Sequence, residues 1–244
     1  MNTDFNKYQD TYKSKIEKSI WFSGQNLDFF TEIKARLIVK LAGKYYGDIK
    51  GLKVLDLGCG IGHTDSFLSD AFNMLYGVDI AEQAVERAKA LNPTVDYSVY
   101  DGLNLPYDDN SFDIVFTICV MHHLQLGERN NFISEIKRIL KNCGIIIVFE
   151  HNPFNCFTRY AVAACEFDKD ALLMSKAELR NLLSENALSM VDEGYIIFFP
   201  FKGNLFRFIE RGLKKLPIGA QYYLIAEKKS LIEEKQDPDR SQGN

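Results

Sequence analysis

The sequence predicts an α/β fold in which an open, mostly parallel β-sheet carries helices on both faces. Short apolar segments alternate with amphipathic segments of helical length, which is the pattern of a parallel sheet with right-handed crossover connections. Two of the expected strands, residues 114–118 and 145–149, are apolar along nearly their whole length. Such strands are typical of a sheet that is covered on both faces. A turn with glycine at every second position, residues 58–62, follows the first strand.

The order of the remaining elements follows from periodicity and from turn residues. Residues 4–20, which mix polar and aromatic side chains, are expected to be helical. Residues 26–46 are also expected to be helical, because they carry apolar side chains at helical spacing. Strands are expected near residues 52–57, 74–79, 95–99, 112–118 and 144–150, with helices near 63–71, 81–91 and 127–140. A helix at 175–186, a strand at 189–199 and a closing strand at 222–226 complete the predicted order.

Composition and charge limit the classes of function. The 244 residues are 46% hydrophobic and 25% charged, which is typical of one globular domain. The formal net charge of −4 provides no basic field for nucleic acid. The longest apolar runs, residues 114–121 and 145–149, are too short to span a bilayer. Because the start has no apolar signal core and the five cysteines form no C-x-x-C pair, we expect a cytoplasmic protein with reduced thiols.

The spacing of the glycine turn indicates which ligand it suits. A dinucleotide fingerprint needs G-x-G-x-x-G, but its third glycine is replaced by His63 when counted from Gly58 and by Asp65 when counted from Gly60. No G-K-[ST] follows, which excludes a phosphate-binding loop. Asp56, two residues before the first glycine, would repel a pyrophosphate and suits a ligand with a positive charge or with hydroxyl and amino donors. S-adenosylmethionine offers a sulfonium, an ammonium and a ribose diol.

Residues 54–62 resemble motif I of the class I, Rossmann-like methyltransferases that use S-adenosylmethionine. They are most similar to the type-11 small-molecule branch, which includes the ubiquinone and menaquinone methyltransferases. Residues 75–80, 101–107 and 111–124 resemble three later motifs of that family, in the right order. The resemblance implies S-adenosylmethionine as cofactor and S-adenosylhomocysteine as product. It also implies a seven-stranded sheet of order 3-2-1-4-5-7-6 whose last strand is antiparallel.

The resemblance further implies which residues contact the cofactor. Asp79 would accept hydrogen bonds from the two ribose hydroxyls, which the two oxygens of a carboxylate suit. Asp101 would accept from the adenine amino group, and the Gly102 N–H would reach a ring nitrogen. The other implied contacts are Asp56, Gly58, Gly60, Gly62, Ile80 and Ile118. Structural alternatives stay open, since Asp56 can hold the turn, Asp79 can cap helix 81–91, and Asp101 can form a turn.

Three histidines are the candidate catalytic residues. His122 and His123 follow the fourth expected strand and His151 follows the fifth, at the edge where open α/β sheets bind ligands. Imidazole titrates near neutral pH, so each histidine is a candidate general base or acceptor contact. We expect no metal ion. The alternative is a metal site made of His122, His123 and Glu150. The side chains of adjacent histidines point in different directions, which argues against that site.

The expected function is methyl transfer to a small-molecule or lipid-linked acceptor, with oxygen preferred over nitrogen or carbon as the methylated atom. The alternatives are a non-catalytic protein that binds the cofactor or acts as a scaffold, an NAD-dependent oxidoreductase and, last, a nucleic-acid methyltransferase. No nucleic acid is expected as a partner. The protein would be a monomer or a homodimer, and peripheral contact with a membrane stays open.

The domain organisation follows from the same resemblance. We expect residues 1–46 to form a helical arm or lid, in which Tyr8, Tyr12 and Trp21 would close over the cofactor. Residues 47–228 would form the methyltransferase domain, with insertions for the acceptor within residues 151–216. Residues 205–216 fit a lid, a dimer surface, a dock for a lipid-linked substrate or an ordinary amphipathic helix. The charged tail, residues 229–244, is expected to be disordered.

Overall fold

The computed structural model describes residues 12–201, 209–210 and 212–229. Within these ranges no helix is both long enough and apolar enough to cross a membrane. The expectations for Tyr8, for nearly all of the tail and for much of segment 205–216 lie outside the described residues.

Seven strands form one sheet in the order β3-β2-β1-β4-β5-β7-β6, which confirms the predicted order. The strands are β1 (Lys53–Leu57), β2 (Met74–Asp79), β3 (Asp96–Val99), β4 (Phe112–Ile118), β5 (Leu140–His151), β6 (Leu188–Ile196) and β7 (Gln221–Lys228). β1 pairs in parallel with β2 and β4, so the glycine turn leaves the middle of the sheet. β7 runs antiparallel to both of its neighbours, β5 and β6.

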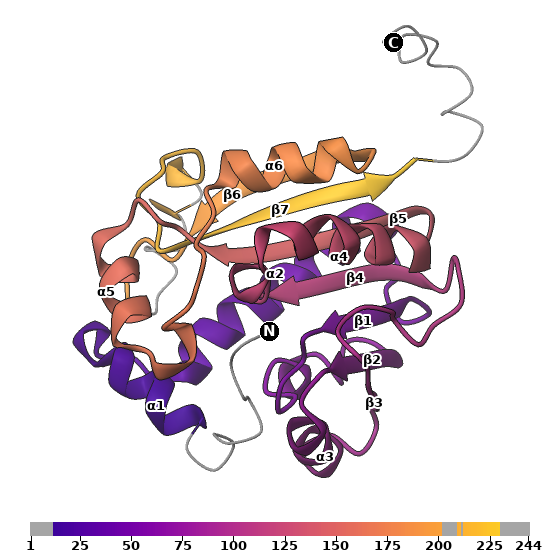
Figure 1. Ribbon diagram of the computed structural model, residues 1–244, viewed down its shortest axis with the longest axis horizontal. Helices are drawn as coiled ribbons and strands as arrows, with labels where there is room; N and C mark the ends of the chain where they lie inside the picture. The colour runs from indigo at the N-terminus through magenta and orange to yellow at the C-terminus, as the bar shows by residue number, and fades with distance from the viewer. Residues whose placement is uncertain (1–11, 202–208, 211, 230–244) are drawn as a thin grey trace, which may run out of the picture.

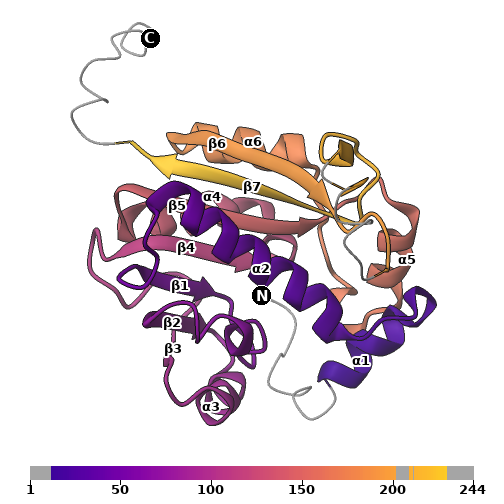
Figure 2. The same cartoon turned by 180° about the vertical axis from the view of Figure 1, so that it is seen from behind.

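Helices cover both faces of the sheet. α4 (Leu126–Ile139) and α6 (Lys176–Glu185) pack on the face seen in Figure 1, and α2 (Leu27–Tyr46) crosses the opposite face in Figure 2. α3 (Glu82–Leu91) shares the apolar core on the side of α2. The strands contribute alternate side chains to the two cores, which explains why β4 and β5 are apolar on both faces.

Local signals explain where the long helices begin. The Asn26 side chain accepts a hydrogen bond from the Phe29 N–H at the start of α2, and α6 begins with a capping box between Ser175 and Glu178. α2 ends at Gly47, which has a φ of 74°. The helices predicted at 26–46, 81–91, 127–140 and 175–186 are all present within one or two residues of their expected ends.

The helix predicted over residues 63–71 is absent, and that prediction was wrong. The segment forms successive turns with one short 3-10 helix, η3 (Asp65–Phe67). The buried Asp65 side chain accepts a hydrogen bond from the Tyr97 hydroxyl at 2.7 Å, which ties this segment to β3. Threonine, aspartate and serine at positions 64–66 compete with helical hydrogen bonds, so local propensity does not oppose the turns.

The strand predicted at 189–199 also ends earlier than expected. β6 stops at Ile196, and the next residue, Ile197, has a φ of 61°, outside the extended region of the backbone. The N–H groups of Phe198 and Phe199 donate to the Glu210 carboxylate instead of to a neighbouring strand. The chain therefore leaves the sheet here and turns toward its carboxyl edge.

Segments far apart in the sequence meet above that edge, at the left of Figure 1. They are α1 (Tyr12–Ser19), η2 (Trp21–Ser23), α5 (Cys156–Ala164) and η5 (Glu166–Asp168). The ring of Phe22 stacks on that of Phe157 with centroids 5.7 Å apart, and Lys15 Nζ lies 2.5 Å from Glu166 Oε2. Trp21, by contrast, is 69% exposed. The N-terminal segment thus roofs the edge through Phe22, while α2 belongs to the layers of the fold.

A methyl group at Gly77 would overlap the Tyr97 ring, whose hydroxyl is fixed by Asp65 and Asn92. We therefore expect Gly77→Ala to lower the free energy of unfolding by about 2 kcal/mol or more, as overpacked cores do. The matched control is Gly43→Ala, on the exposed side of α2 with open space around it, which should raise stability by about 0.5–1 kcal/mol. Urea unfolding of both variants measures this, and equal stabilities would contradict the packing at Gly77.

Candidate active site

A cavity of about 530 Å³ lies at the carboxyl ends of the central strands. Its floor is formed by the residues that end β1, β2, β4 and β5, and its roof by α1, η2 and α5. This volume is within the range of small-molecule sites, about 300–1,000 Å³. Two groups of polar side chains line it, one beside β1 and β2 and one beside β4, β5 and β7.

The glycine turn is fixed to the end of β2 by backbone hydrogen bonds. The N–H groups of Gly58 and Cys59 donate to the Val78 carbonyl at 2.8 and 3.1 Å, and the Gly60 N–H donates to Asp79 Oδ2 at 2.8 Å. The other Asp79 oxygen accepts from the Ala81 N–H at 2.9 Å. Burial raises the pKa of Asp79, and these backbone N–H groups oppose that rise. Each carboxylate oxygen keeps further acceptor capacity at the cavity wall.

The three glycines of the turn serve different purposes. Gly58 and Gly60 line the cavity, and a Cβ at Gly60 would meet nothing within 4 Å. Gly62, which was predicted to contact the cofactor, lies outside the cavity lining. A Cβ there would lie 2.6 Å from the Tyr97 hydroxyl and 2.7 Å from Asn92 Nδ2. Gly62 therefore permits close packing against α3 and β3.

Two buried carboxyl groups lie beneath the turn. Asp56 and Asp65 are 2% and 0% exposed, and the Oδ1 atom of each has no hydrogen-bond donor among the described residues. Burial and then the neighbouring Asp65 carboxylate raise the pKa of Asp56 well above its usual range, and burial also raises the pKa of Asp65. Two carboxylates buried next to each other repel, so the pair favours a state in which one of them is protonated. Asp56 also reaches the cavity wall.

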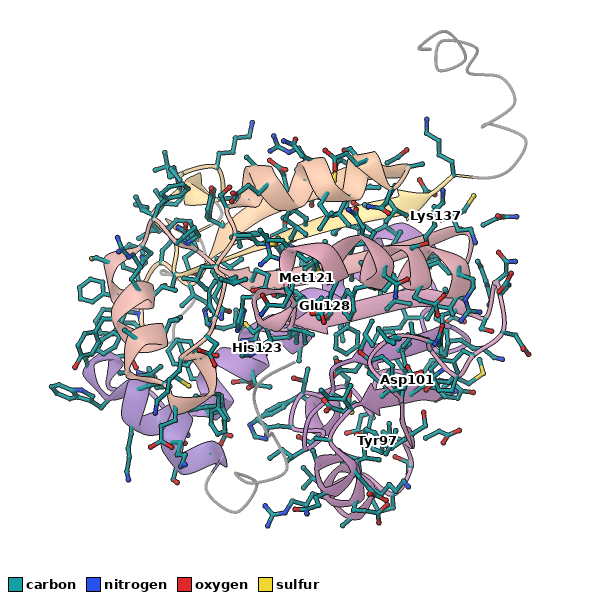
Figure 3. All side chains as sticks on the ribbon, in the orientation of Figure 1. Tyr97, Asp101, Met121, His123, Glu128 and Lys137 are labelled. Carbon is teal, nitrogen blue, oxygen red and sulfur yellow. The ribbon has the colours of Figure 1, made fainter. Side chains whose placement is uncertain are left out.

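The predicted cofactor contacts outside the glycine turn divide into two sets. Ile80 and Ile118 line the cavity, and so does Tyr100, which was not predicted. Asp101 is exposed, and its Oδ1 atom accepts from the Leu103 and Asn104 N–H groups at 2.7 Å each. Figure 3 shows Asp101 on the β3 side of the molecule, whereas His123 lies toward α1 and α5. The Asp101 side chain thus stabilises a turn, which was the structural alternative to an adenine contact.

His122 is buried between two carboxylates. Its Nδ1 atom lies 2.7 Å from Glu150 Oε2, its Nε2 atom lies 3.3 Å from Asp168 Oδ1, and Glu150 Oε1 accepts from the Met121 N–H at 2.8 Å. Burial lowers the pKa of His122, but Glu150 and Asp168 outweigh burial and raise it to about 10. The same interactions hold the pKa of Asp168 at about 2 despite its burial. His122 is therefore an imidazolium, and both acids are carboxylates at neutral pH.

The other two histidines adjoin this pair and are neutral. His123 Nε2 lies 3.5 Å from Asp168 Oδ1, and the rings of His122 and His151 are 5.2 Å apart. Burial, reinforced by the charge of His122, lowers the pKa of both His123 and His151 to about 4. All three predicted catalytic histidines therefore line one cavity, opposite the glycine turn.

Comparison of the sequence with known proteins identifies a family. The family model described as a methyltransferase domain matches residues 55–148. The 2-methyl-6-phytyl-1,4-hydroquinone methyltransferase of Synechocystis sp. is 34% identical over 106 residues, which are 42% of this chain and 33% of that protein. The ubiquinone biosynthesis O-methyltransferase of Bartonella quintana is 30% identical over 165 residues, which are 62% of this chain and 66% of that protein.

A solved S-adenosylmethionine-dependent methyltransferase of Thermotoga maritima superposes with a TM-score of 0.65 at 20% identity, over 92% of this chain and 98% of that one. This chain belongs to the class I S-adenosylmethionine-dependent methyltransferases. S-adenosylmethionine is the cofactor of this family. The matches cover 33%, 50% and 37% of the length of the first three curated relatives, so this chain corresponds to only part of each of them.

Several polar residues of the cavity were not predicted as site residues, and three of them lie beside the histidines or donate to one of these residues. Lys34 comes from α2, Asp168 from η5 and Gln221 from the first position of β7. Lys34 had a signal, because a lysine on the buried side of an amphipathic helix is unusual. Asp168 and Gln221 had none, since only the tertiary fold brings them beside His122 and His151.

The alternative metal site has a different composition from the one considered in the sequence. His122, His123 and Asp168 bring ligand atoms within 4.8 Å of one another, whereas Glu150 bonds the opposite nitrogen of His122. Both nitrogens of His122 already face a carboxylate. Hydrogen bonds to an imidazolium therefore account for this arrangement.

Replacing His122 should destabilise the methyltransferase in a pH-dependent way. His122→Ala leaves Glu150 and Asp168 buried without their cation, which we expect to cost about 3 kcal/mol at neutral pH. Because the folded-state pKa is raised from 6.5 to about 10, the contribution of His122 is complete below pH 6.5 and is lost as the pH rises through about 10. Urea unfolding of wild type and variant from pH 6 to 10.5 measures the difference. A gap that stays constant over this range would contradict the imidazolium.

Proposed function

We propose that this protein transfers the methyl group of S-adenosylmethionine to a small-molecule or lipid-linked acceptor, by in-line displacement within the cavity described above. One observation carries the proposal. A single cavity has the Asp79-fixed glycine turn on one wall and the histidine–carboxylate cluster on the other. When bound, S-adenosylmethionine supplies an activated methyl group with its own leaving group. The chain then has to align an acceptor and exclude water.

The residues beside β1 and β2 fit the cofactor. We assign the ribose hydroxyls to Asp79, whose oxygens keep acceptor capacity at the cavity wall. Gly58 and Gly60 let the backbone approach the ligand, and Asp56 offers a carboxyl oxygen without a hydrogen-bond partner among the described residues beneath the turn. Ile80 and Ile118 supply apolar contact. Asp101 and Gly102 remain a proposed adenine contact through their backbone, since the Asp101 carboxylate is engaged by its own loop.

His123 is the proposed general base for an oxygen acceptor. The anionic Asp168 oxygen can only accept, so the proton of neutral His123 belongs on Nε2, which leaves Nδ1 as the basic nitrogen. His122 is a positioning residue, because it holds Asp168 in place through an ion pair. His151 receives a hydrogen bond on Nδ1 from Gln221 Nε2 at 3.4 Å, so it presents Nε2–H and is proposed to orient the acceptor.

Oxygen is the proposed acceptor atom, followed by nitrogen and carbon. A neutral histidine held by a carboxylate suits an acceptor that must lose a proton, as hydroxyl groups do. The named relatives include a ubiquinone biosynthesis O-methyltransferase and a hydroquinone methyltransferase, which supports an acceptor with an apolar part. Apolar side chains of the roof, among them Phe22, Phe157 and Phe167, line the cavity as well. We propose that α1 and η2 act as the lid of this site.

Two other functions were considered. A dinucleotide-binding oxidoreductase has the strand order 3-2-1-4-5-6, and the antiparallel β7 between β5 and β6 departs from it. A non-catalytic cofactor-binding protein would share the fold, because fold alone does not fix chemistry. The buried histidine–carboxylate cluster favours catalysis, because perturbed titratable groups gather at functional sites.

The cofactor assignment is tested at Asp79. Asp79→Ala should weaken S-adenosylhomocysteine binding at least tenfold, about 1.4 kcal/mol, because the ribose loses its acceptors and the Gly60 N–H loses its partner. Calorimetry measures the dissociation constant. Asp96→Ala, an exposed position on β3, is the matched control and should bind as wild type does. Undiminished binding by Asp79→Ala would refute the assignment.

The base assignment is tested by a pH profile. Because burial and the charge of His122 lower the pKa of His123 to about 4, kcat for an oxygen acceptor should stay level below pH 6.5 and fall only as the pH approaches 4. His123→Ala should lower kcat about 100-fold while S-adenosylhomocysteine affinity stays near wild type. The assay is S-adenosylhomocysteine release over a panel of hydroxylated acceptors. A limb near pH 6.5, or full turnover by His123→Ala, would rule out this base.

A further inference from the structure

Four segments in mutual contact border one end of the cavity. They are residues 20–25, 152–164, 197–201 and 216–220, and together we call them the rim. Each segment contributes residues to the cavity lining. The rim lies above the carboxyl edge of the sheet, around η2 and α5, at the left of Figure 1 and at the right of Figure 2. Its outer surface is therefore the surface from which this end of the cavity is reached.

The N-terminal segment of the rim contacts two of the others. The ring of Phe22 packs against those of Phe157 and Tyr160, with centroids 5.7 and 5.5 Å apart. On its other side, Gln25 Nε2 donates to the Pro200 carbonyl at 2.9 Å. Residues 20–25 thus connect α5 with the loop that follows β6.

The segment before β7 completes the series of contacts. Asn155 Nδ2, at the start of α5, donates to the Ile218 carbonyl at 2.7 Å. The Ala220 N–H donates to the Ile197 carbonyl at 3.0 Å, just after the end of β6. The four segments are therefore joined in a closed series, and they form one continuous surface around the cavity.

The rim exposes large apolar side chains. Trp21, Phe154 and Phe157 are 69%, 71% and 63% exposed. Phe157 also lines the cavity, so the exposed apolar surface continues into the cavity wall. Among the described residues, Phe67 is the one exposed large aromatic side chain outside the rim. A concentration of this kind marks an interaction surface. The other exposed apolar side chains of the rim are Tyr160, Phe201, Leu216 and Ile218.

The rim carries almost no charge. Its segments contain a single charged residue, Arg159, although 25% of the whole chain is charged. Arg159 is exposed and forms no ion pair among the described residues. Lys18, in the last turn of α1, is also exposed, and it attracts Glu166. The carboxylates of the adjoining helices have partners of their own: Glu17 with the Leu27 N–H, Asp28 with Lys13, and Glu166 with Lys15.

Aromatic side chains beside a basic residue, without an acidic one, fit the interface of a phospholipid bilayer. At that interface indole and phenol rings lie at the level of the headgroups, and basic side chains reach the lipid phosphates. A second copy of the chain seated on the rim would cover the cavity. A bilayer instead places the cavity beside the phase in which an acceptor with an apolar part dissolves.

We propose that the rim docks this protein on a phospholipid bilayer and that the acceptor enters the cavity from the bilayer. The inference rests on the proposed function and narrows its acceptor to the lipid-linked class. Trp21 and Phe154 insert below the headgroups, and Arg159 contacts the lipid phosphates. Phe157, which belongs to both the exposed surface and the cavity wall, lies on the path of the apolar part of the acceptor.

The test is flotation of the full-length protein with vesicles of phosphatidylcholine that contain about 30% phosphatidylglycerol. Wild type should float with the vesicles. The double variant Trp21→Ser/Phe154→Ser should lower the partition coefficient about tenfold or more, because two exposed apolar side chains are lost. The matched control is Leu91→Ser, which is 51% exposed at the end of α3 and should partition as wild type does. Wild type that does not float, or a double variant that floats as well as wild type, would overturn the proposal.

Two further measurements separate this inference from its alternatives. If the rim joins two copies of the chain, light scattering would show a wild-type dimer that the double variant converts to a monomer, without vesicle binding, and this would overturn bilayer docking. All variants should bind S-adenosylhomocysteine as wild type does, because Trp21, Phe154 and Leu91 lie outside the cavity lining. Wild type that floats but binds no S-adenosylhomocysteine would refute the proposed function, whereas wild type that binds it without floating would overturn this inference alone.

Discussion

The ion pair between Glu150 and His122 sets the electrostatics of the whole acceptor side. Glu150 is 1% exposed at the end of β5, so its charge requires a cation, and His122 is the one in contact. The charge of His122 in turn holds Asp168 as a carboxylate, and burial followed by this charge lowers the pKa of His123 and His151. Five titratable groups thus take defined protonation states from one contact. Neutral bases beside a fixed imidazolium follow from burial and charge balance.

The cofactor side depends on a different kind of constraint. There, backbone hydrogen bonds fix the geometry, because N–H groups of the glycine turn donate to the Val78 carbonyl and to the Asp79 carboxylate. Asp79 is therefore both a structural tie and a candidate ligand, and the two interpretations of the sequence are compatible. Gly62 and Gly77 contribute by leaving room for Tyr97, whose hydroxyl connects β3 to Asp65 beneath the turn. The space behind the turn is therefore closely packed.

Features of the fold that depend on short-range sequence patterns could be predicted from the sequence. Sheet order, the long helices and the cavity positions of Asp79 and the three histidines follow from periodicity, caps and motif spacing. The helix expected over residues 63–71 failed because a tertiary contact, Asp65 with Tyr97, decides that segment. The close packing of Tyr97 and Asn92 against Gly62 was not predicted, because glycine spacing cannot tell whether the missing side chain faces a ligand or a neighbouring helix. The positions of Asp168 and Gln221 in the cavity could not be predicted, because they depend on how β5, β7 and η5 pack together.

This difference has a physical origin in how the two halves of the cavity are built. The methyl-donor half uses consecutive residues of one strand–turn unit and the end of the next strand, so its geometry is written in short motifs. The acceptor half draws on α2, the loops after β4 and β5, and the start of β7, which lie nearly 190 residues apart along the chain. Lys34 precedes every recognisable motif, and its burial is evident only when α2 is packed on the sheet. Selectivity for the acceptor therefore has to be derived from side chains that only the folded protein brings together in one cavity.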